Sequence, residues 1–164
     1  QETCHQSCRR NGVFETQNEH RVIGSAEEAN ELVKTVVNQH TGRYNSFLTQ
    51  FSEGFQATSL EMHKWLLFAL LETPIVDLGR GIRQAEIRRI LRDNHPEGTS
   101  LNPGNLTQAL QSAASLQVKK GIKPIVLDYD NTNLRLRVVD RSFLIWLENQ
   151  DRGEIRENLD FPIE

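Results

Sequence analysis

The stretch from residue 102 to residue 140 constrains the fold most, because it joins a well-defined helix to two short strands. Asn102 is a good helix N-cap, and Pro103 suits the first helical position. Gly121 is a natural C-terminal stop. The apolar residues between them recur at helical spacing and are Leu106, Ala109, Leu110, Ala113 and Leu116. We predict a helix over 103–118.

Two short apolar-alternating segments follow this helix. Ile125, Leu127 and Tyr129 alternate with other residues in the first, and the second repeats the pattern at Leu134, Leu136 and Val138. The Asp and Asn residues between the segments favour a tight turn. We therefore predict antiparallel pairing between 123–129 and 134–139, laid against the preceding helix.

The N-terminal part of the chain predicts further helices. Residues 1–24 are polar and lack periodicity, so we expect a flexible segment. Ser25 and Glu28 have the spacing of a capping box that opens a helical extension over 25–57. Thr41-Gly42 interrupts its apolar stripe, which leaves open one long helix with a weak point or two helices. A second capping box, Thr58 to Glu61, predicts a helix that is apolar on nearly every side through Leu71.

The remaining elements complete a domain over 58–150. Ile75 to Leu78 could form a short strand, and a helix is expected from Arg83 to about Arg92. Ser142 opens a last helix, and we expect residues 151–164 to form a loose acidic tail. The predicted fold class is mainly α with a small antiparallel β-hairpin.

The element order over residues 59–149 resembles that of the winged helix-turn-helix family. The resemblance implies a winged-helix core that carries an N-terminal helical extension. In DNA-binding members the second helix of the turn motif enters the major groove. It thus implies double-stranded DNA as a partner, with contacts from Thr107, Gln108, Gln111, Ser112, Ser115, Lys119, Lys120, Arg88, Arg89, Arg92, Arg135 and Arg137.

The charge distribution partly supports nucleic-acid binding. Residues 80–141 carry eleven basic against six acidic side chains, whereas the flanking segments each have about four surplus negative charges. Asp128 and Asp130 nevertheless lie at the predicted wing tip, where they would oppose a phosphate backbone. The alternative is a protein-interaction or accessory domain excised from a larger multidomain protein such as an ATPase. The lack of an initiator methionine and the apolar helix at 62–71 motivate it.

The letters Asp128-x-Asp130-x-Thr132 after an apolar run resemble the first motif of the haloacid-dehalogenase superfamily. That resemblance implies phosphotransfer at Asp128, with Asp130 as acid/base and magnesium at the phosphate. Only 32 residues follow Thr132, too few for the crossovers of a parallel sheet. The same letters fail as a calcium loop, because Asn133 and Val139 occupy the Gly and Glu positions.

Other chemistry has little support in the sequence. Cys4 and Cys8 with His5 fall short of the four ligands of a structural zinc site, and the histidine spacing matches no metalloprotease motif. We expect His63 to be a half-buried helix residue. No apolar run approaches the ~20 residues of a membrane span. We therefore expect a non-enzymatic, cytoplasmic module without catalytic residues, metal or cofactor, and its oligomeric state stays open.

Overall fold

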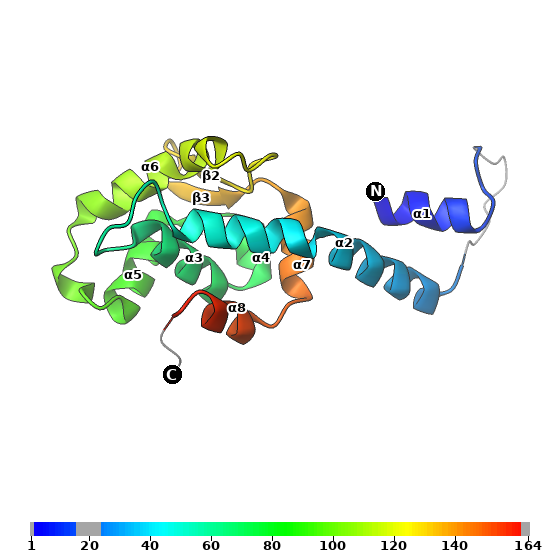
Figure 1. Ribbon diagram of the computed structural model, residues 1–164, viewed down its shortest axis with the longest axis horizontal. Helices are drawn as coiled ribbons and strands as arrows, with labels where there is room; N and C mark the ends of the chain where they lie inside the picture. The colour runs from blue at the N-terminus through cyan, green and yellow to red at the C-terminus, as the bar shows by residue number, and fades with distance from the viewer. Residues whose placement is uncertain (1, 16–23, 162–164) are drawn as a thin grey trace. The chain divides into compact units, whose positions relative to one another are not determined.

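A computed structural model describes residues 2–15 and 24–161 of the 164-residue chain (Figure 1). The fold is mainly helical and contains a small antiparallel sheet, so the predicted fold class is confirmed. The chain divides into two compact units, residues 1–42 and residues 43–164. The second unit therefore begins and ends outside the expected boundaries at 58 and 150.

The first unit holds helix α1 (Glu2–Arg10) and the first part of helix α2 (Ala26–Ser52). Residues 2–10 are helical, which differs from the flexible segment expected there. The Ser25 capping box forms: the Ser25 amide donates to Glu28 Oε2 at 3.0 Å, and the Glu28 amide donates to Ser25 Oγ at 3.2 Å. Helix α2 continues through Thr41-Gly42 without a break, which decides between the two alternatives.

Helix α3 (Met62–Glu72) is the centre of the second unit. Its side chains from Trp65 to Leu71 are all buried, as the apolar pattern predicts. The predicted capping box at Thr58–Glu61 is wrong. Glu61 has φ of +42° and lies next to the first helical residue, and no side chain caps the helix. The left-handed backbone of Glu61 directs the chain into the helix, and the Thr58 hydroxyl does not cap it.

The segment after α3 forms a single helical turn, α4 (Ile75–Leu78), and not the short strand that its sequence could form. The Asp77 and Leu78 amides both donate to the Pro74 carbonyl at 3.0 Å, which closes the turn. The first strand, β1 (Ile82–Arg83), comes four residues later. Helices α5 (Gln84–Asn94) and α6 (Pro103–Lys119) follow, joined by a short 3₁₀ turn, η1 (Gly98–Ser100).

Strands β2 (Leu127–Asp130) and β3 (Arg135–Val138) form the predicted hairpin. They pair antiparallel, with Leu127 opposite Val138 and Asp130 opposite Arg135. β1 pairs antiparallel with the other edge of β3, so the strand order is β1-β3-β2. Asp128 thus lies on an edge strand of an antiparallel sheet, unlike the parallel sheet that surrounds the phosphatase motif in its family.

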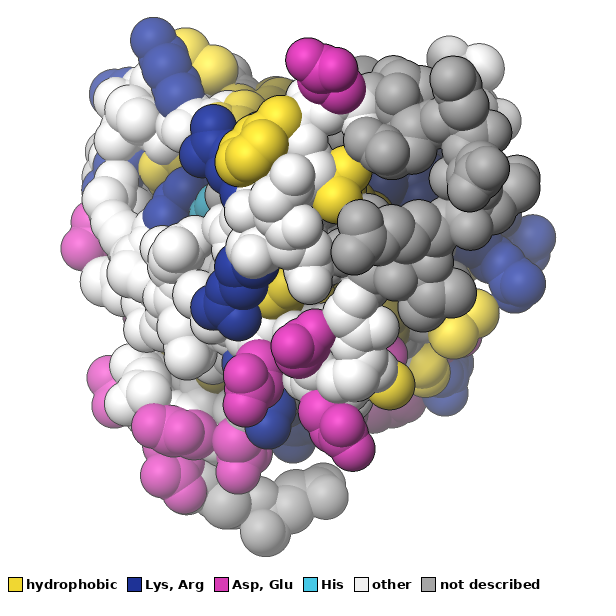
Figure 2. All heavy atoms as spheres, turned by 90° about the vertical axis from the view of Figure 1, so that its right-hand side faces the viewer, with side chains coloured by type: hydrophobic (Ala, Val, Ile, Leu, Met, Phe, Trp, Pro, Cys, Tyr) yellow, Lys and Arg dark blue, Asp and Glu magenta, His cyan; other side chains and the backbone are white. Residues whose placement is uncertain are grey.

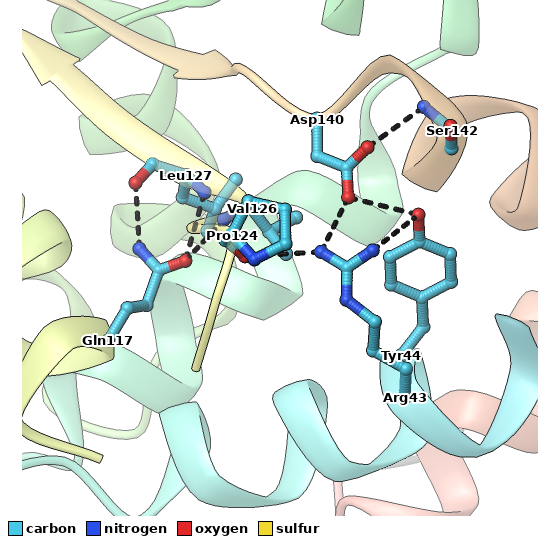
Figure 3. A network of polar contacts seen from close by, with 8 residues as sticks. All are labelled: Arg43, Tyr44, Gln117, Pro124, Val126, Leu127, Asp140 and Ser142. Atoms are coloured by element: carbon cyan, nitrogen blue, oxygen red, sulfur yellow. Dashed lines mark hydrogen bonds and ion pairs between the residues drawn. The ribbon is translucent and has the colours of Figure 1, made fainter. Parts of the chain in front are cut away.

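Gln117 joins helix α6 to strand β2 (Figure 3). Its side chain is fully buried. Its Oε1 accepts from the Val126 and Leu127 amides at 2.6 and 3.1 Å, and its Nε2 donates to the Leu127 carbonyl at 2.7 Å. Nε2 also donates to the Ala113 carbonyl at 2.9 Å. The Gln117 side chain therefore bonds the backbone N–H and C=O groups at the start of β2, on the edge where no neighbouring strand pairs with them.

A second polar cluster holds the later half of α2 against the end of the sheet (Figure 3). Asp140 Oδ2 accepts from Arg43 Nη2 at 2.7 Å and from the Tyr44 hydroxyl at 3.0 Å. Arg43 Nη2 also donates to the Pro124 carbonyl. Asp140 Oδ1 accepts from the Ser142 amide, which caps helix α7 (Arg141–Glu148). Burial and the Asp140 carboxylate raise the pKa of the Tyr44 hydroxyl to about 12.

The C-terminal segment is ordered further than expected. Residues Arg152–Asn158 form helix α8, capped by Asp151, so the loose tail predicted for 151–164 is wrong at least through Phe161. Arg152 Nη1 donates to the Leu71 and Thr73 carbonyls at 2.7 and 2.8 Å. Phe161 is buried against the rings of Trp65 and Phe68. The sequence did not predict these contacts, because acidic residues surround the few apolar residues of this segment.

Candidate functional site

The outer face of α6 carries most of the residues that the sequence nominated for DNA contact. Gln108, Gln111, Ser115 and Lys119 are exposed, so helical geometry placed them correctly on one side. Thr107 is half-buried and is occupied within the fold. Its Oγ1 accepts from Gln84 Nε2 at 2.9 Å, and Gln84 Oε1 accepts from the Tyr129 hydroxyl at 2.6 Å.

A groove of about 630 Å³ runs beside this face of α6. Its second wall is the connection between α2 and α3, residues 53–61, where the sequence predicted the end of the helical extension at 57 and a capping box at Thr58–Glu61. Gln108 and Ser112 of α6 line the groove, whereas Gln111 and Ser115 lie outside it. The volume lies in the range of ligand and peptide pockets.

His63 holds the two walls together. Its ring lies edge-on to Phe51 and Phe55, with centroids 5.5 and 5.8 Å away, and its Nε2 lies 3.1 Å from Ser112 Oγ. The Ser112 hydroxyl donates to the Ala109 carbonyl at 3.1 Å. A hydroxyl has a single hydrogen to donate, so Ser112 Oγ accepts from His63 Nε2, and Nδ1 is the acceptor nitrogen.

Gly54 allows this close approach. Its φ is +65°, and a Cβ there would lie 3.2 Å from His63 Nδ1. Any other residue would have to adopt a left-handed backbone and push the imidazole aside. Gly54 was the available sequence signal for this wall, because a glycine just after a helix indicates a left-handed turn that ends it.

Burial lowers the pKa of His63 below its ordinary value of 6.5. Below pH 6.5 the unfolded chain then binds more protons than the folded one, so this contribution to stability is present above pH 6.5 and is lost as pH falls.

We expect wild type to lose more stability than His63→Gln between pH 7 and pH 5. Urea unfolding midpoints at both pH values measure the difference; equal losses would contradict it.

Both predicted phosphate-binding lysines of α6 already contact the groove's second wall. Lys120 Nζ forms an ion pair with Glu53 Oε2 at 2.6 Å. Lys119 Nζ lies 5.1 Å from the centroid of the Phe55 ring, within cation–π range. A phosphate would have to compete with these contacts.

The arginines of α5 are mostly paired along their own helix. Arg89 Nη2 lies 2.5 Å from Glu86 Oε1, and Arg92 Nε lies 3.2 Å from Asp93 Oδ1. Arg88 is exposed and has no ion pair among residues 2–15 and 24–161. The hydrogen bond from Arg89 lowers the pKa of Glu86, so that carboxylate keeps its charge beside the arginine.

The hairpin arginines are also occupied. Arg137 Nη2 lies 2.8 Å from Asp130 Oδ2, and Arg135 Nη1 donates to the Gly81 carbonyl at 2.7 Å. Asp130 closes the turn by accepting from the Thr132 and Asn133 amides. Hydrogen bonds from the Asn133 side chain and amide lower the pKa of Asp130. The Asp130 carboxylate therefore holds the hairpin turn together.

Exposed carboxylates lie on and around α8. Figure 2 shows acidic side chains in magenta toward the bottom of its view. Around α8 the exposed carboxylates are Glu148 at the end of α7, Asp151 at the cap, Glu154 and Glu157 on the helix, and Asp160 after it. The two arginines of α8 do not offset them outward, because Arg152 binds backbone carbonyls and Arg156 pairs with Glu72. This part of the surface would repel a polyanion.

Among residues 2–15 and 24–161, no three His, Cys, Asp or Glu residues are grouped as metal ligands, and no helix is long and apolar enough to cross a bilayer. Cys4 and Cys8 of α1 are free thiols. No protein-family model, curated protein or solved structure matches this chain.

Proposed function

We propose that this chain is a non-enzymatic winged-helix module that binds a protein partner through the groove beside α6. The order α3, β1, α5, α6, β2, β3 with sheet order β1-β3-β2 agrees with the winged-helix resemblance. Fold does not fix function, so the proposal rests on the face itself. Its main support is that residues 53–61 stand beside the helix that would otherwise enter a DNA groove.

Electrostatics also favours a protein partner over DNA. Of the seven basic residues nominated from sequence, four are in ion pairs and Arg135 is bound to a carbonyl. Each phosphate contact lowers log K by ~0.9 per tenfold rise in salt, because it requires a cation that displaces counterions. With few uncommitted cations, the module should bind a duplex weakly and with a shallow salt dependence.

The proposal is tested with a labelled duplex of random sequence, by fluorescence anisotropy at 50 and 200 mM NaCl. We expect a Kd weaker than about 10 µM at the higher salt, the range of non-specific binding. The double variant Lys119→Glu/Lys120→Glu should change this little. Submicromolar binding with a steep salt dependence, abolished in the double variant, would overturn the proposal.

DNA binding is the second candidate function. It is favoured by Gln111 and Ser115, which are exposed on α6 outside the groove, and by Arg88, which is exposed on α5. Gln and Ser can read base edges. A specific operator would then bind through these side chains, and Gln111→Ala together with Ser115→Ala would reduce its affinity while leaving random duplex unaffected.

A further inference from the structure

The groove beside α6 contains no uncompensated charge among its described lining residues. Three of them are ionised: Lys120, Glu53 and Glu61. Lys120 and Glu53 pair with each other, and Glu61 Oε2 lies 3.6 Å from Lys64 Nζ. Burial keeps His63 neutral at physiological pH by lowering its pKa. Charge complementarity therefore selects an uncharged occupant, because a charged one would lose hydration without gaining a counter-ion.

One wall of the groove is apolar and partly open to solvent. The Phe55 ring is 41% exposed, and its other contacts are the edge-on His63 ring and the Lys119 ammonium. Ala57, Leu60 and Met62 continue this wall, and Ala109 of α6 faces it. An exposed aromatic ring beside a groove is stabilised most when another large apolar side chain covers it and excludes water.

The opposite wall carries neutral hydrogen-bonding groups. Asn105, Gln108 and Ser112 line the groove at positions i, i+3 and i+7 of α6. Seven residues of helix rise about 10 Å, which is close to three residues of extended chain at ~3.3 Å each. Each carboxamide offers a donor and an acceptor, the complement of a peptide N–H and C=O.

We infer that the groove binds an extended, uncharged peptide segment of a partner protein, anchored by one bulky apolar side chain against Phe55. The Asn105 and Gln108 carboxamides bond its backbone, and the anchor covers the Phe55 ring. This inference deepens the proposed function and depends on it. A second copy of this chain and a small molecule are the other occupants that the test distinguishes.

The test uses the full chain as bait for a phage library of random seven-residue peptides. We expect enrichment of sequences with one large apolar residue and no charge in the flanking three positions. A synthetic peptide of the enriched sequence should bind wild type with a Kd that is unchanged between 50 and 500 mM NaCl. Titration calorimetry measures both values.

Gln108→Glu and Gln111→Glu form the matched pair of variants. Both make the same change on an exposed position of α6, but Gln108 lines the groove and Gln111 does not. A carboxylate at 108 would be desolvated by the bound anchor, so we expect at least a tenfold loss of affinity, about 1.4 kcal/mol. Gln111→Glu should bind like wild type.

Several outcomes would overturn the inference. They are failure of any peptide to enrich, enrichment of charged peptides with salt-dependent affinity, and equal affinity of the two variants. Self-association that Gln108→Glu abolishes would assign the groove to a second copy instead. These outcomes do not depend on the duplex measurement. The proposed function is overturned separately, by tight DNA binding with a steep salt dependence.

Discussion

Gln117→Leu is expected to lower the free energy of unfolding by about 3–5 kcal/mol, because each buried polar group left without a partner costs roughly 1–3 kcal/mol. Leucine has nearly the same size but leaves the Val126 amide, the Leu127 amide and the Leu127 carbonyl without their partner. The melting temperature should fall by on the order of 10 °C for a chain of this length. Urea unfolding followed by circular dichroism measures the change.

Gln111→Leu is the matched control, because it makes the same substitution six residues earlier on the exposed side of α6. The hydrogen bond from its side chain to Asn131 is 3.5 Å long and exposed. The control should change stability by about 0.5 kcal/mol or less. A loss for Gln117→Leu no larger than that of the control would show that water or a shifted backbone replaces the buried amide.

Asp140→Ala is expected to cost about 2–4 kcal/mol, between the values for an exposed and a fully buried ion pair. The change removes one hydrogen-bond partner each of the Arg43 guanidinium and the Tyr44 hydroxyl, and it removes the cap of α7. The Asp140 side chain is 11% exposed, so solvent can replace little of this bonding. Chemical denaturation of the full chain gives the value.

A double-mutant cycle with Arg43→Met separates the ion pair from the cap. The interaction energy between the two substitutions should be about 1–3 kcal/mol, the range for residues in contact. Asp140→Asn should retain the cap to Ser142 and lose mainly the charge. A coupling energy near zero would mean that α2 is held by its apolar residues alone.

The elements that sequence predicted well are those with complete local signals. Asn102 accepts from the Gly104 amide as an N-cap should, and α6 ends beside Gly121, whose φ is +73°. The hairpin formed as predicted because the alternation of its apolar residues agrees with the Asp and Asn residues of its turn. In these places local propensity and tertiary packing favour the same structure.

Predictions failed where a short motif was outweighed by packing. Thr58 and Glu61 have capping-box spacing, yet the chain between them belongs to the groove wall and the helix begins at Met62. At the C-terminus, Ile155, Leu159 and Phe161 are buried although acidic residues surround them. A four-residue spacing carries too little information to predict which long-range partner a segment will meet.

The candidate site was half predictable. Helical periodicity identified the exposed residues of α6, including Gln108 and Gln111, from the sequence alone. The second wall could not be predicted, because it depends on His63 meeting Ser112 across 49 residues of sequence. The ion pairs of the basic residues could not be predicted either, because the net charge of a segment does not show which carboxylates lie beside them.

The contacts of the C-terminal segment determine how much chain a self-sufficient fragment must contain. Arg152 binds the otherwise unpaired carbonyls at the end of α3, and Phe161 covers Trp65 and Phe68. At the other end, the Tyr44 and Phe47 rings pack edge-on against the Phe143 ring. A recombinant piece trimmed to 58–150 would thus expose aromatic surface at both margins and aggregate, whereas one that retains 43–161 keeps these contacts.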